Sequence, residues 1–259
     1  MCGCFGLVAA FEGNLDWTAY FVGLATVFDF FDGFAARLLK VSSAIGKDLD
    51  SLADMVTFGL VPGVVMFKLL LINSSGQLEF NSFEWNSATV SMWDKIVPFA
   101  AFLIPVFSAL RLAKFNNDTR QTDSFIGLPT PANAIFICSI PLIIMQLSQH
   151  FIESSFHPGA QFPLHRDPLW ELLNNTFILL VLVVVFSLLL VAELPLFALK
   201  FKSFGWKGNE IRFIFLGLSL ILLITLKFIG IPLIIILYIL LSVVNNLIKK
   251  KKNSPSHEG

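Results

Sequence analysis

The chain has 259 residues, of which 56% are hydrophobic and only 14% are charged. A soluble domain of average composition carries about 25% charged residues, so this composition excludes an ordinary soluble protein. Lysine plus arginine and aspartate plus glutamate each number 18, and this balance gives no reason to expect nucleic-acid binding. The apolar residues gather in runs such as 177–192 and 213–226, which are typical of membrane-spanning helices. We therefore predict an all-α, polytopic transmembrane helix bundle.

About eight helices are expected along the chain. The first, 1–12, is apolar but too short to cross a bilayer alone, and we expect it to be the second half of a helix whose beginning is missing from this chain. Turn signals such as Glu12-Gly13-Asn14 separate the helices. The other seven are expected at 17–41, 48–72, 93–115, 128–149, 174–194, 210–228 and 231–248.

Basic residues are distributed unevenly between the two ends of these helices. Fourteen of the 18 lysines and arginines lie in segments that alternate with acidic or neutral ones, and basic segments stay on the cytoplasmic side. We therefore predict a multi-pass protein of the inner (plasma) membrane, with the loops 42–47, 116–127 and 195–209 in the cytoplasm. Lys68 falls near an outer helix end, where its long side chain is expected to snorkel to the interface.

Four aspartates lie within two of the expected apolar helices: Asp29, Asp32, Asp50 and Asp54. A charged side chain inside a membrane helix costs at least about 2.5–3.5 kcal/mol on insertion scales, so each is a candidate for a functional site. Four neighbouring carboxylates also repel one another unless cations compensate their charge. Their presence predicts a cation-binding site within the membrane.

The spacing brings the four carboxylates together. Asp29 and Asp32 are three residues apart on one side of a helix, and Asp50 and Asp54 are four apart on the next helix. The short link between the two helices makes them antiparallel neighbours, so the two acidic stripes can face each other. Asp29 lies about 16 Å along its helix from Lys40, which predicts a site in the cytoplasmic half of the bilayer.

Small residues accompany the acidic stripes. Gly33, Ala36 and Gly46 fall on the same sides of the two helices and leave room for a ligand to approach the backbone. Sites made only of carboxylate oxygens suit hard divalent cations such as Mg²⁺ or Mn²⁺, and a two-metal carboxylate site is a familiar arrangement for phosphoryl transfer. Arg37 follows the stripe and suits a phosphate contact; equally, it suits a cytoplasmic anchor at the helix end.

These residues also form an extended motif. Positions 29–54 fit the pattern D-x2-D-G-x2-A-R-x8-G-x3-D-x3-D at all eight fixed positions. This pattern resembles the signature of the CDP-alcohol phosphotransferases, and its fixed internal gap makes it far more specific than a short motif. The likeness to one branch of this family, the phosphatidylserine synthases, covers nearly the whole chain and is strongest over 19–67 and 105–134. Asp48 lies outside the pattern, and we expect it to be a solvated residue at the helix start.

The resemblance implies a role for each motif residue. The four aspartates would hold two divalent metal ions, Mg²⁺ or Mn²⁺, that bind the CDP pyrophosphate, and Asp54 would also deprotonate the acceptor hydroxyl. The family tends to form homodimers. We divide the chain accordingly into family core helices over 1–194, two additional transmembrane helices over 195–248 and a basic, disordered cytoplasmic tail over 249–259. The nucleotide and phosphate pocket would be lined by Asp32, Gly33, Ala36, Arg37 and Gly46.

A second conspicuous region, 111–134, bears on the acceptor alcohol. Together with the segment after Asp50 it resembles the phosphatidylserine synthase branch of the family, which implies CDP-diacylglycerol and L-serine as substrates and membrane lipid as the environment. A serine site needs a cation for the carboxylate and acceptors for the ammonium group. The candidates are Arg111, Lys114 and Arg120 for the first and Asn116 or Asn133 for the second. The alternative for this region is cytoplasmic positive charge followed by a proline-rich helix start.

Two other functions stay open at this point. The same fold could use glycerol 3-phosphate or an inositol phosphate as acceptor, although a phosphorylated acceptor favours a denser basic cluster than 111–120 offers. A divalent-cation transporter also places carboxylates within the membrane, but it predicts polar residues through both halves of the bilayer. Here the acidic residues are confined to two helices in one half.

Overall fold

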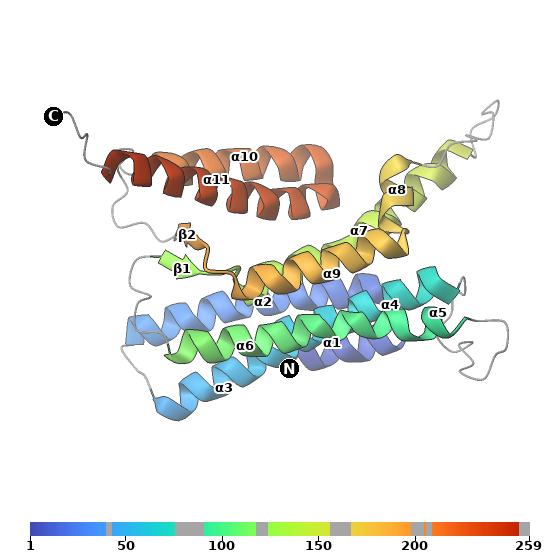
Figure 1. The fold of residues 1–259 in the computed structure, drawn as a ribbon, viewed down its shortest axis with the longest axis horizontal. Coiled ribbons are helices and arrows are strands. Elements are labelled where there is room, and N and C mark those ends of the chain that lie inside the picture. The colour runs from blue at the N-terminus through green and yellow to red at the C-terminus, as the bar shows by residue number, and fades with distance from the viewer. Residues whose placement is uncertain are drawn as a thin grey trace.

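The computed structural model describes residues 1–39, 43–75, 91–117, 124–155, 167–197, 205 and 209–253. These residues form a bundle of long helices that run roughly side by side (Figure 1). Five helical stretches among them are long and apolar enough to cross a membrane. The last of the five, Glu210–Ile248, contains the turn between two antiparallel helices. The predicted all-α polytopic bundle is therefore confirmed.

The chain begins with a helical hairpin. Helix α1 (Cys2–Phe11) packs along α2 (Leu15–Leu39), and the turn between them passes through Gly13, whose φ of +86° is readily adopted only by glycine. The hydroxyl of Thr18 is fully buried and donates to the carbonyl of Gly6 at 3.2 Å, which ties the two helices together. The turn predicted at Glu12-Gly13-Asn14 is confirmed.

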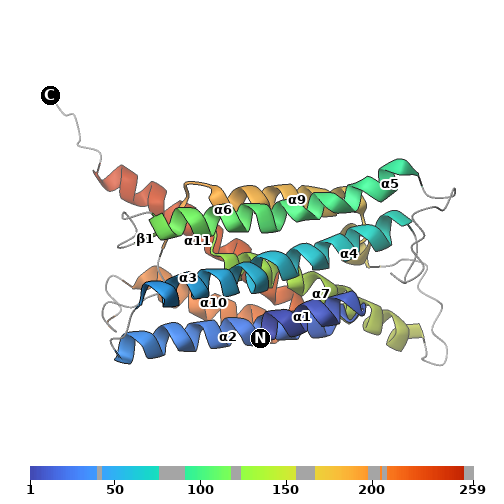
Figure 2. The ribbon, with the colours of Figure 1, turned by 90° about the horizontal axis from the view of Figure 1, so that it is seen from below.

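The next helix is continuous but changes its winding. Helix α3 (Ala44–Asp54) runs through a π-helical segment, η1 (Met55–Leu60), into α4 (Val61–Ser75), as Figure 2 shows. Its N-cap is Ser43, whose Oγ accepts the backbone N–H of residue 46 at 3.0 Å. The helix therefore starts four residues earlier than predicted, because the cap serine was not read as a helix start.

Helices α4 and α7 (Thr130–Ser155) form the interior of the bundle. Most of the apolar part of each is buried, whereas α2 and the C-terminal helices are largely exposed along their lipid-facing sides. The segment α5 (Met92–Ile96), η3 (Val97–Phe102) and α6 (Leu103–Asn117) covers one side of α4. Moving an apolar helix surface from lipid to a protein contact releases little free energy, so close side-chain packing must hold such helices together.

Two further helices complete this part of the bundle. Helix α9 (Thr176–Val191) packs on α6, and its Phe186 stacks on Phe136 of α7 with ring centroids 3.8 Å apart. The short helix α8 (Pro168–Leu173) was not predicted; Asp167 caps it and its first residue is proline, which is a common helix start.

Lys68 joins α4 to the end of α1. Its side chain is only 2% exposed, and its Nζ donates to the carbonyl of Phe11 at 3.1 Å. The prediction that Lys68 snorkels to the membrane surface is therefore wrong. The last carbonyls of α1 lack partners within the helix and carry partial negative charge, so a buried ammonium group is stabilised there.

The C-terminal part adds a helical hairpin and a small strand pair. Strand β1 (Ser124–Ile126) pairs antiparallel with β2 (Pro195–Phe197), which was not predicted. Helices α10 (Glu210–Leu226) and α11 (Gly230–Asn253) pack against each other and lie across α7. Helix α11 is longer than predicted and continues through the lysines 249–252, since lysine is a good helix former; 254–259 lie outside the described residues.

The ends of the helices agree with the charge pattern. The end of α2, the start of α3, the end of α6 and both ends of the C-terminal hairpin gather at one end of the bundle, on the left in Figure 1. The described helix ends that border the basic segments therefore lie together, and the far ends of α4, α5 and α7 lie at the opposite end of the bundle.

Close packing of α4 against α6 can be tested at Gly63. A Cβ atom there would lie 2.8 Å from Cδ of Pro105, a ring atom that cannot rotate away. We expect Gly63→Ala to lower the free energy of unfolding by about 1–3 kcal/mol, measured by thermal unfolding in detergent. Gly217→Ala is the matched control, since a Cβ at Gly217 meets nothing within 4 Å; equal effects in the two variants would contradict this account.

Candidate active site

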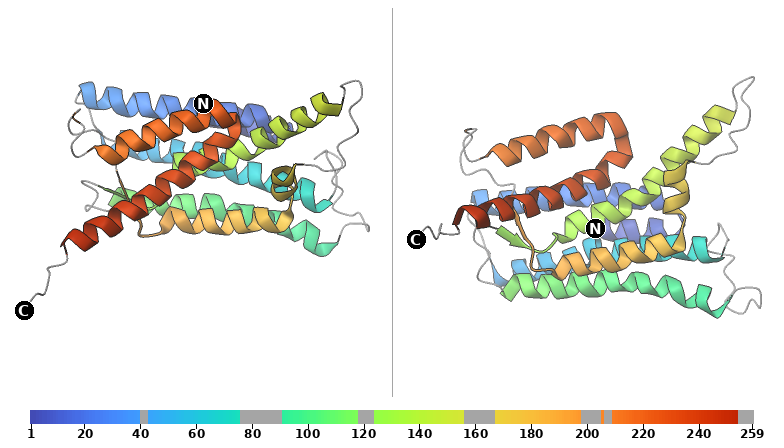
Figure 3. Two further views of the ribbon diagram at one scale, coloured as in Figure 1. Left: turned by 90° about the horizontal axis from the view of Figure 1, so that it is seen from above. Right: turned by 45° about the horizontal axis from the view of Figure 1, so that its top comes forward.

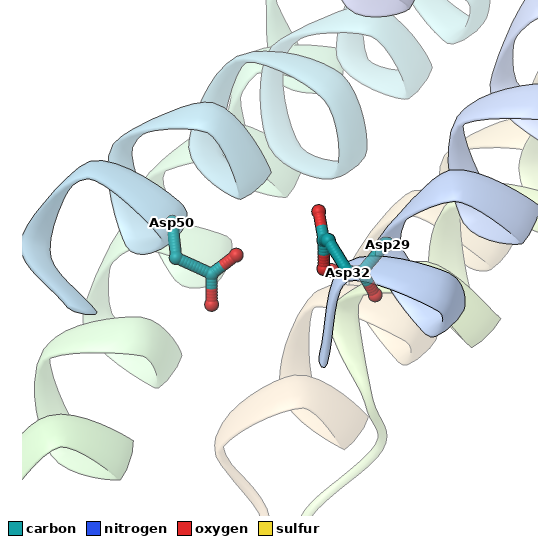
Figure 4. Close-up of side chains that lie close together, drawn as sticks. All are labelled: Asp29, Asp32 and Asp50. Atoms are coloured by element: carbon teal, nitrogen blue, oxygen red, sulfur yellow. The ribbon is translucent and has the colours of Figure 1, made fainter. Parts of the chain in front are cut away.

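Two helices with different neighbours carry the acidic residues. Helix α2 packs mainly on α1 and α7, whereas α3 is held through η1 and α6. The parts of α2 and α3 that carry the aspartates therefore stand apart. Asp29 and Asp32 on α2 face Asp50 on α3 across the space between the two helices (Figure 4). Asp32 and Asp50 are exposed and Asp29 is half-buried, so this space is open to ligands.

The three carboxylates are close enough to share one ion. One oxygen from each of Asp29, Asp32 and Asp50 lies within 4.8 Å of the other two. Oxygens that bind the same Mg²⁺ or Ca²⁺ lie about 2.0–2.6 Å from the ion, which allows separations of this size. The donor set consists of hard, anionic oxygens and fits a divalent cation. The predicted convergence of the two acidic stripes is confirmed for these residues.

Asp54 lies one turn further along the same helix face. It is half-buried and falls outside the group of three, but it is within electrostatic range of Asp29, Asp50 and Arg111. The π-helical segment begins directly after it. Each additional residue in a helical turn rotates the later part of the helix by about 100°, so α3 can turn its aspartates to the open space while α4 keeps its own faces in the core.

Tight contacts hold the π-helical segment in place. A Cβ at Gly59 would lie 3.1 Å from Cβ of Ser108 on α6, and a Cβ at Gly3 of α1 would lie 3.0 Å from Cα of Thr57. Neighbouring helices thus press on η1 from two sides. This packing fixes the direction of Asp54 without any contribution from the carboxylates.

The small motif residues have different surroundings. Gly33 and Ala36 are exposed, and a Cβ at Gly33 would meet nothing within 4 Å, so the α2 side of the space is open. At Gly46 a Cβ would lie 2.9 Å from Oγ of the N-cap Ser43. Gly46 therefore also has a local role in the cap of α3. The side chain of Arg37 lies outside the described residues.

A hydrogen-bonded network joins α3 to the end of α6. The Nζ of Lys47 donates to the carbonyl of Asn116 at 3.1 Å, and Nδ2 of Asn116 donates to Oγ of Ser51 at 3.0 Å. Asn116, an expected acceptor ligand, is thus already engaged in positioning α3. Lys114 is exposed, and Arg120 lies outside the described residues.

Two other expected acceptor residues lie inside the bundle. Arg111 is 8% exposed, and its Nη1 donates to Oγ1 of Thr130 at 3.4 Å. Asn133 is fully buried one turn along α7 from Thr130, so the three side chains share one region. Within the described residues, Oδ1 and Nδ2 of Asn133 and Nε of Arg111 have no hydrogen-bond partner.

Some residues of this region were not predicted. Thr130 binds Arg111, and the buried hydroxyl of Ser108 lies one turn before Arg111 on α6 without a partner in the described part of the chain. Ser51 bridges to Asn116. Serine and threonine occur in membrane helices for many reasons. Only the packing of α3, α6 and α7 therefore distinguishes Thr130, Ser108 and Ser51 from the other hydroxyl residues of the chain.

A family comparison decides how this arrangement is classified. Residues 1–189 match the family model described as CDP-alcohol phosphatidyltransferase. The chain belongs to the CDP-alcohol phosphatidyltransferase family. The matched part contains all of α1 to α8 and nearly all of α9, including the carboxylates of α2 and α3, and it ends before strand β2.

Several curated relatives of the chain carry the same name. The chain is 31% identical over 131 residues to the CDP-diacylglycerol–serine O-phosphatidyltransferase of Bacillus subtilis, which is 51% of this chain and 63% of that relative. It is 33% identical over 132 residues to the protein of that name from Mycobacterium leprae, 48% of this chain and 37% of the relative. The chain thus spans about half the length of the curated relatives it matches.

The metal-binding role of the carboxylates can be tested on Asp50. We expect Asp50→Asn to weaken Mn²⁺ binding by at least about 10-fold, since even changes behind the ligands weaken metal sites by about 10–100-fold. Isothermal titration calorimetry of the purified protein in detergent measures this. Asp48→Asn is the matched control, because Asp48 is exposed on the same helix and outside the acidic group; the same loss in both variants would exclude a specific site.

Proposed function

We propose that this protein transfers the phosphatidyl group of CDP-diacylglycerol to L-serine and releases CMP. The observation that carries this proposal is the convergence of Asp29, Asp32 and Asp50 from two helices onto one open space in a CDP-alcohol phosphatidyltransferase. The printed names of its relatives support serine as the acceptor. The protein is a multi-pass membrane protein, and the basic helix ends support a site on the cytoplasmic side.

The carboxylates would hold divalent metal, Mg²⁺ or Mn²⁺, and we expect two ions with Asp54 as the fourth ligand. Bound metal would neutralise the pyrophosphate oxygens and stabilise the charge on the leaving CMP. The open face at Gly33 and Ala36 leaves space for the nucleotide beside Asp32. Arg37 and Gly46 complete this proposed nucleotide and phosphate pocket.

Asp54 is the proposed base. The serine hydroxyl oxygen forms a bond to the phosphorus that carries the diacylglycerol, the bond from this phosphorus to the CMP oxygen breaks, and the hydroxyl proton passes to the Asp54 carboxylate. Its half-buried position between the acidic group and Arg111 supports this role, because it adjoins both the phosphate side and the proposed acceptor side.

Arg111 and Asn133 are the proposed core of the serine site. A guanidinium group pairs well with a carboxylate, and an amide oxygen accepts from an ammonium group. Buried polar atoms without partners are rare in proteins, and the unpartnered atoms of these two side chains support a polar ligand between α6 and α7. Lys114 and Arg120 would attract the anionic substrates to this end, while Asn116 would contribute mainly through Ser51.

Further parts of the proposal concern assembly. We propose that 1–194 are the family core, that 195–248 add two transmembrane helices, and that the protein is a homodimer in the membrane. The match to residues 1–189 supports the first boundary. The packing of α10 against α11 supports a separate C-terminal hairpin.

The reaction can be tested by CMP release from CDP-diacylglycerol in detergent. We expect release that depends on serine, is abolished by a chelator, and is restored by Mn²⁺ or Mg²⁺. Asp54→Asn should lower kcat by about 10²–10⁴-fold, the usual contribution of a general base. Release with glycerol 3-phosphate or an inositol phosphate, but not with serine, would reject the acceptor and retain the chemistry.

The serine site can be tested on Asn133. Asn133→Leu removes two unpartnered buried atoms, so we expect equal or higher thermal stability. We also expect the KM for serine to rise by about 10-fold, because one hydrogen bond to a charged group of the substrate is lost. Asn73→Leu is the matched control, because Asn73 has an unpartnered buried Nδ2 at the outer end of α4. An unchanged serine KM in Asn133→Leu would remove Asn133 from the site.

A further inference from the structure

The strand pair joins two parts of the chain that are far apart in sequence. Strand β1 lies within the family match and leads directly into the start of α7, whereas β2 follows the match and leads toward the α10–α11 hairpin. In the register Phe125 lies opposite Leu196. The backbone that precedes Thr130 is therefore fixed by a strand outside the family match.

Helix α11 in turn holds β2 through side chains. The hydroxyl of Tyr238 donates to the carbonyl of Phe197 at 2.9 Å, and Nδ2 of Asn246 donates to the carbonyl of Pro195. Carbonyls two residues apart point to the same side of a strand. These two belong to the edge of β2 that does not pair with β1, so their partners must come from outside the sheet. Helix α11, the dark red helix in Figure 3, packs against β2 and supplies both donors.

Tyr238 also packs against aromatic rings in addition to its hydrogen bond. It is 8% exposed, and its ring lies 5.0 Å from that of Phe197 and 5.7 Å from that of Phe215 on α10, measured between centroids. At the other end of the hairpin the backbone N–H of Phe228 donates to Oε1 of Gln146 on α7 at 3.1 Å. The hairpin is thus attached at both ends.

The connection between β1 and α7 depends on the same region. The N–H of Gly127 donates to the carbonyl of Leu194 at 3.0 Å, and that of Leu128 donates to the carbonyl of Leu189 at 2.9 Å. Gly127 has a φ of +77°, and a Cβ there would lie 2.6 Å from the carbonyl oxygen of Leu190. The chain between β1 and α7 is held on the end of α9 and the start of β2.

We infer that Tyr238 and Asn246 are positioning residues for the acceptor site, an inference that rests on the function proposed above. They fix β2, β2 fixes β1 and the turn at Gly127, and that turn sets the start of α7, where Thr130 binds Arg111 and Asn133 lies in the same region. The α10–α11 hairpin is then part of acceptor recognition rather than a membrane anchor alone.

The first test measures the structural link without using activity. Hydrogen–deuterium exchange of the full protein in detergent is followed over residues 124–133 for wild type, Tyr238→Phe and Asn246→Leu. Loss of one hydrogen bond should speed exchange in this segment by about 3- to 10-fold. Tyr20→Phe is the matched control, because Tyr20 is the only other tyrosine and is exposed on α2.

The second test measures the effect on the acceptor. Tyr238→Phe and Asn246→Leu should raise the KM for serine by about 3- to 10-fold and leave the KM for CDP-diacylglycerol and the unfolding temperature nearly unchanged, as in Tyr20→Phe. An unchanged KM for serine in both variants would overturn the inference. A lower kcat together with a lower unfolding temperature would also overturn it, because it would indicate general destabilisation of the protein. Wild-type protein without serine-dependent CMP release would instead reject the proposed function, while exchange over 124–133 still decides the structural link.

Discussion

Mutual repulsion among carboxylates is the constraint that shapes this molecule. Their oxygens lie within 4.8 Å of one another, where two full charges repel by at least about 3 kcal/mol at an effective dielectric constant of 20. The two pairs that Asp50 of α3 forms with Asp29 and Asp32 of α2 would therefore drive these helices apart. The fold answers this by anchoring the two helices to different neighbours: α2 packs on α1 and α7, whereas α3 is hydrogen-bonded to the end of α6 and continues into η1, which packs on α6. Neither helix depends on contact with the other, so the space between them persists for cations and substrate to fill.

Rigidity around the site comes from contacts that do not involve the carboxylates. Gly3 and Gly59 let neighbouring helices press on the π-helical segment, and Lys47 fastens the start of α3 to the end of α6. A π-helical segment is intrinsically less favourable than an α-helix and occurs mostly at functional sites. Its position directly after Asp54 is consistent with that pattern, because the direction of the Asp54 side chain matters for the proposed site.

Hydrogen bonding distinguishes structural from functional polar groups in this bundle. Thr18 and Lys68 are buried, and each donates to a backbone carbonyl of α1, so both contribute to folding. Among the described residues, Asn133 is the side chain with both amide atoms buried and unpartnered. A buried amide without partners is destabilising. In the proposed serine site beside Arg111, the bound substrate would satisfy it.

The sequence was most informative where the chemistry is unusual for a membrane. Carboxylates within apolar helices are rare, so Asp29, Asp32 and Asp50 could be expected to lie together from their spacing, and the structure brings their oxygens within 4.8 Å of one another. Helix number and type followed from apolar runs. The start of α3 was missed because Ser43 is a cap that periodicity does not reveal.

Contacts to backbone carbonyls could not be predicted in the same way. Every residue offers a carbonyl, so neither the partner of Lys68 nor that of Tyr238 leaves a trace in the sequence. The same holds for the strand pair, because segments of three residues are too short for a periodic signal. Strands β1 and β2 meet where the end of α9 and the start of α7 lie side by side. The acidic motif could therefore be recognised from local sequence, whereas the framework that orients the start of α7 arises from packing between distant segments.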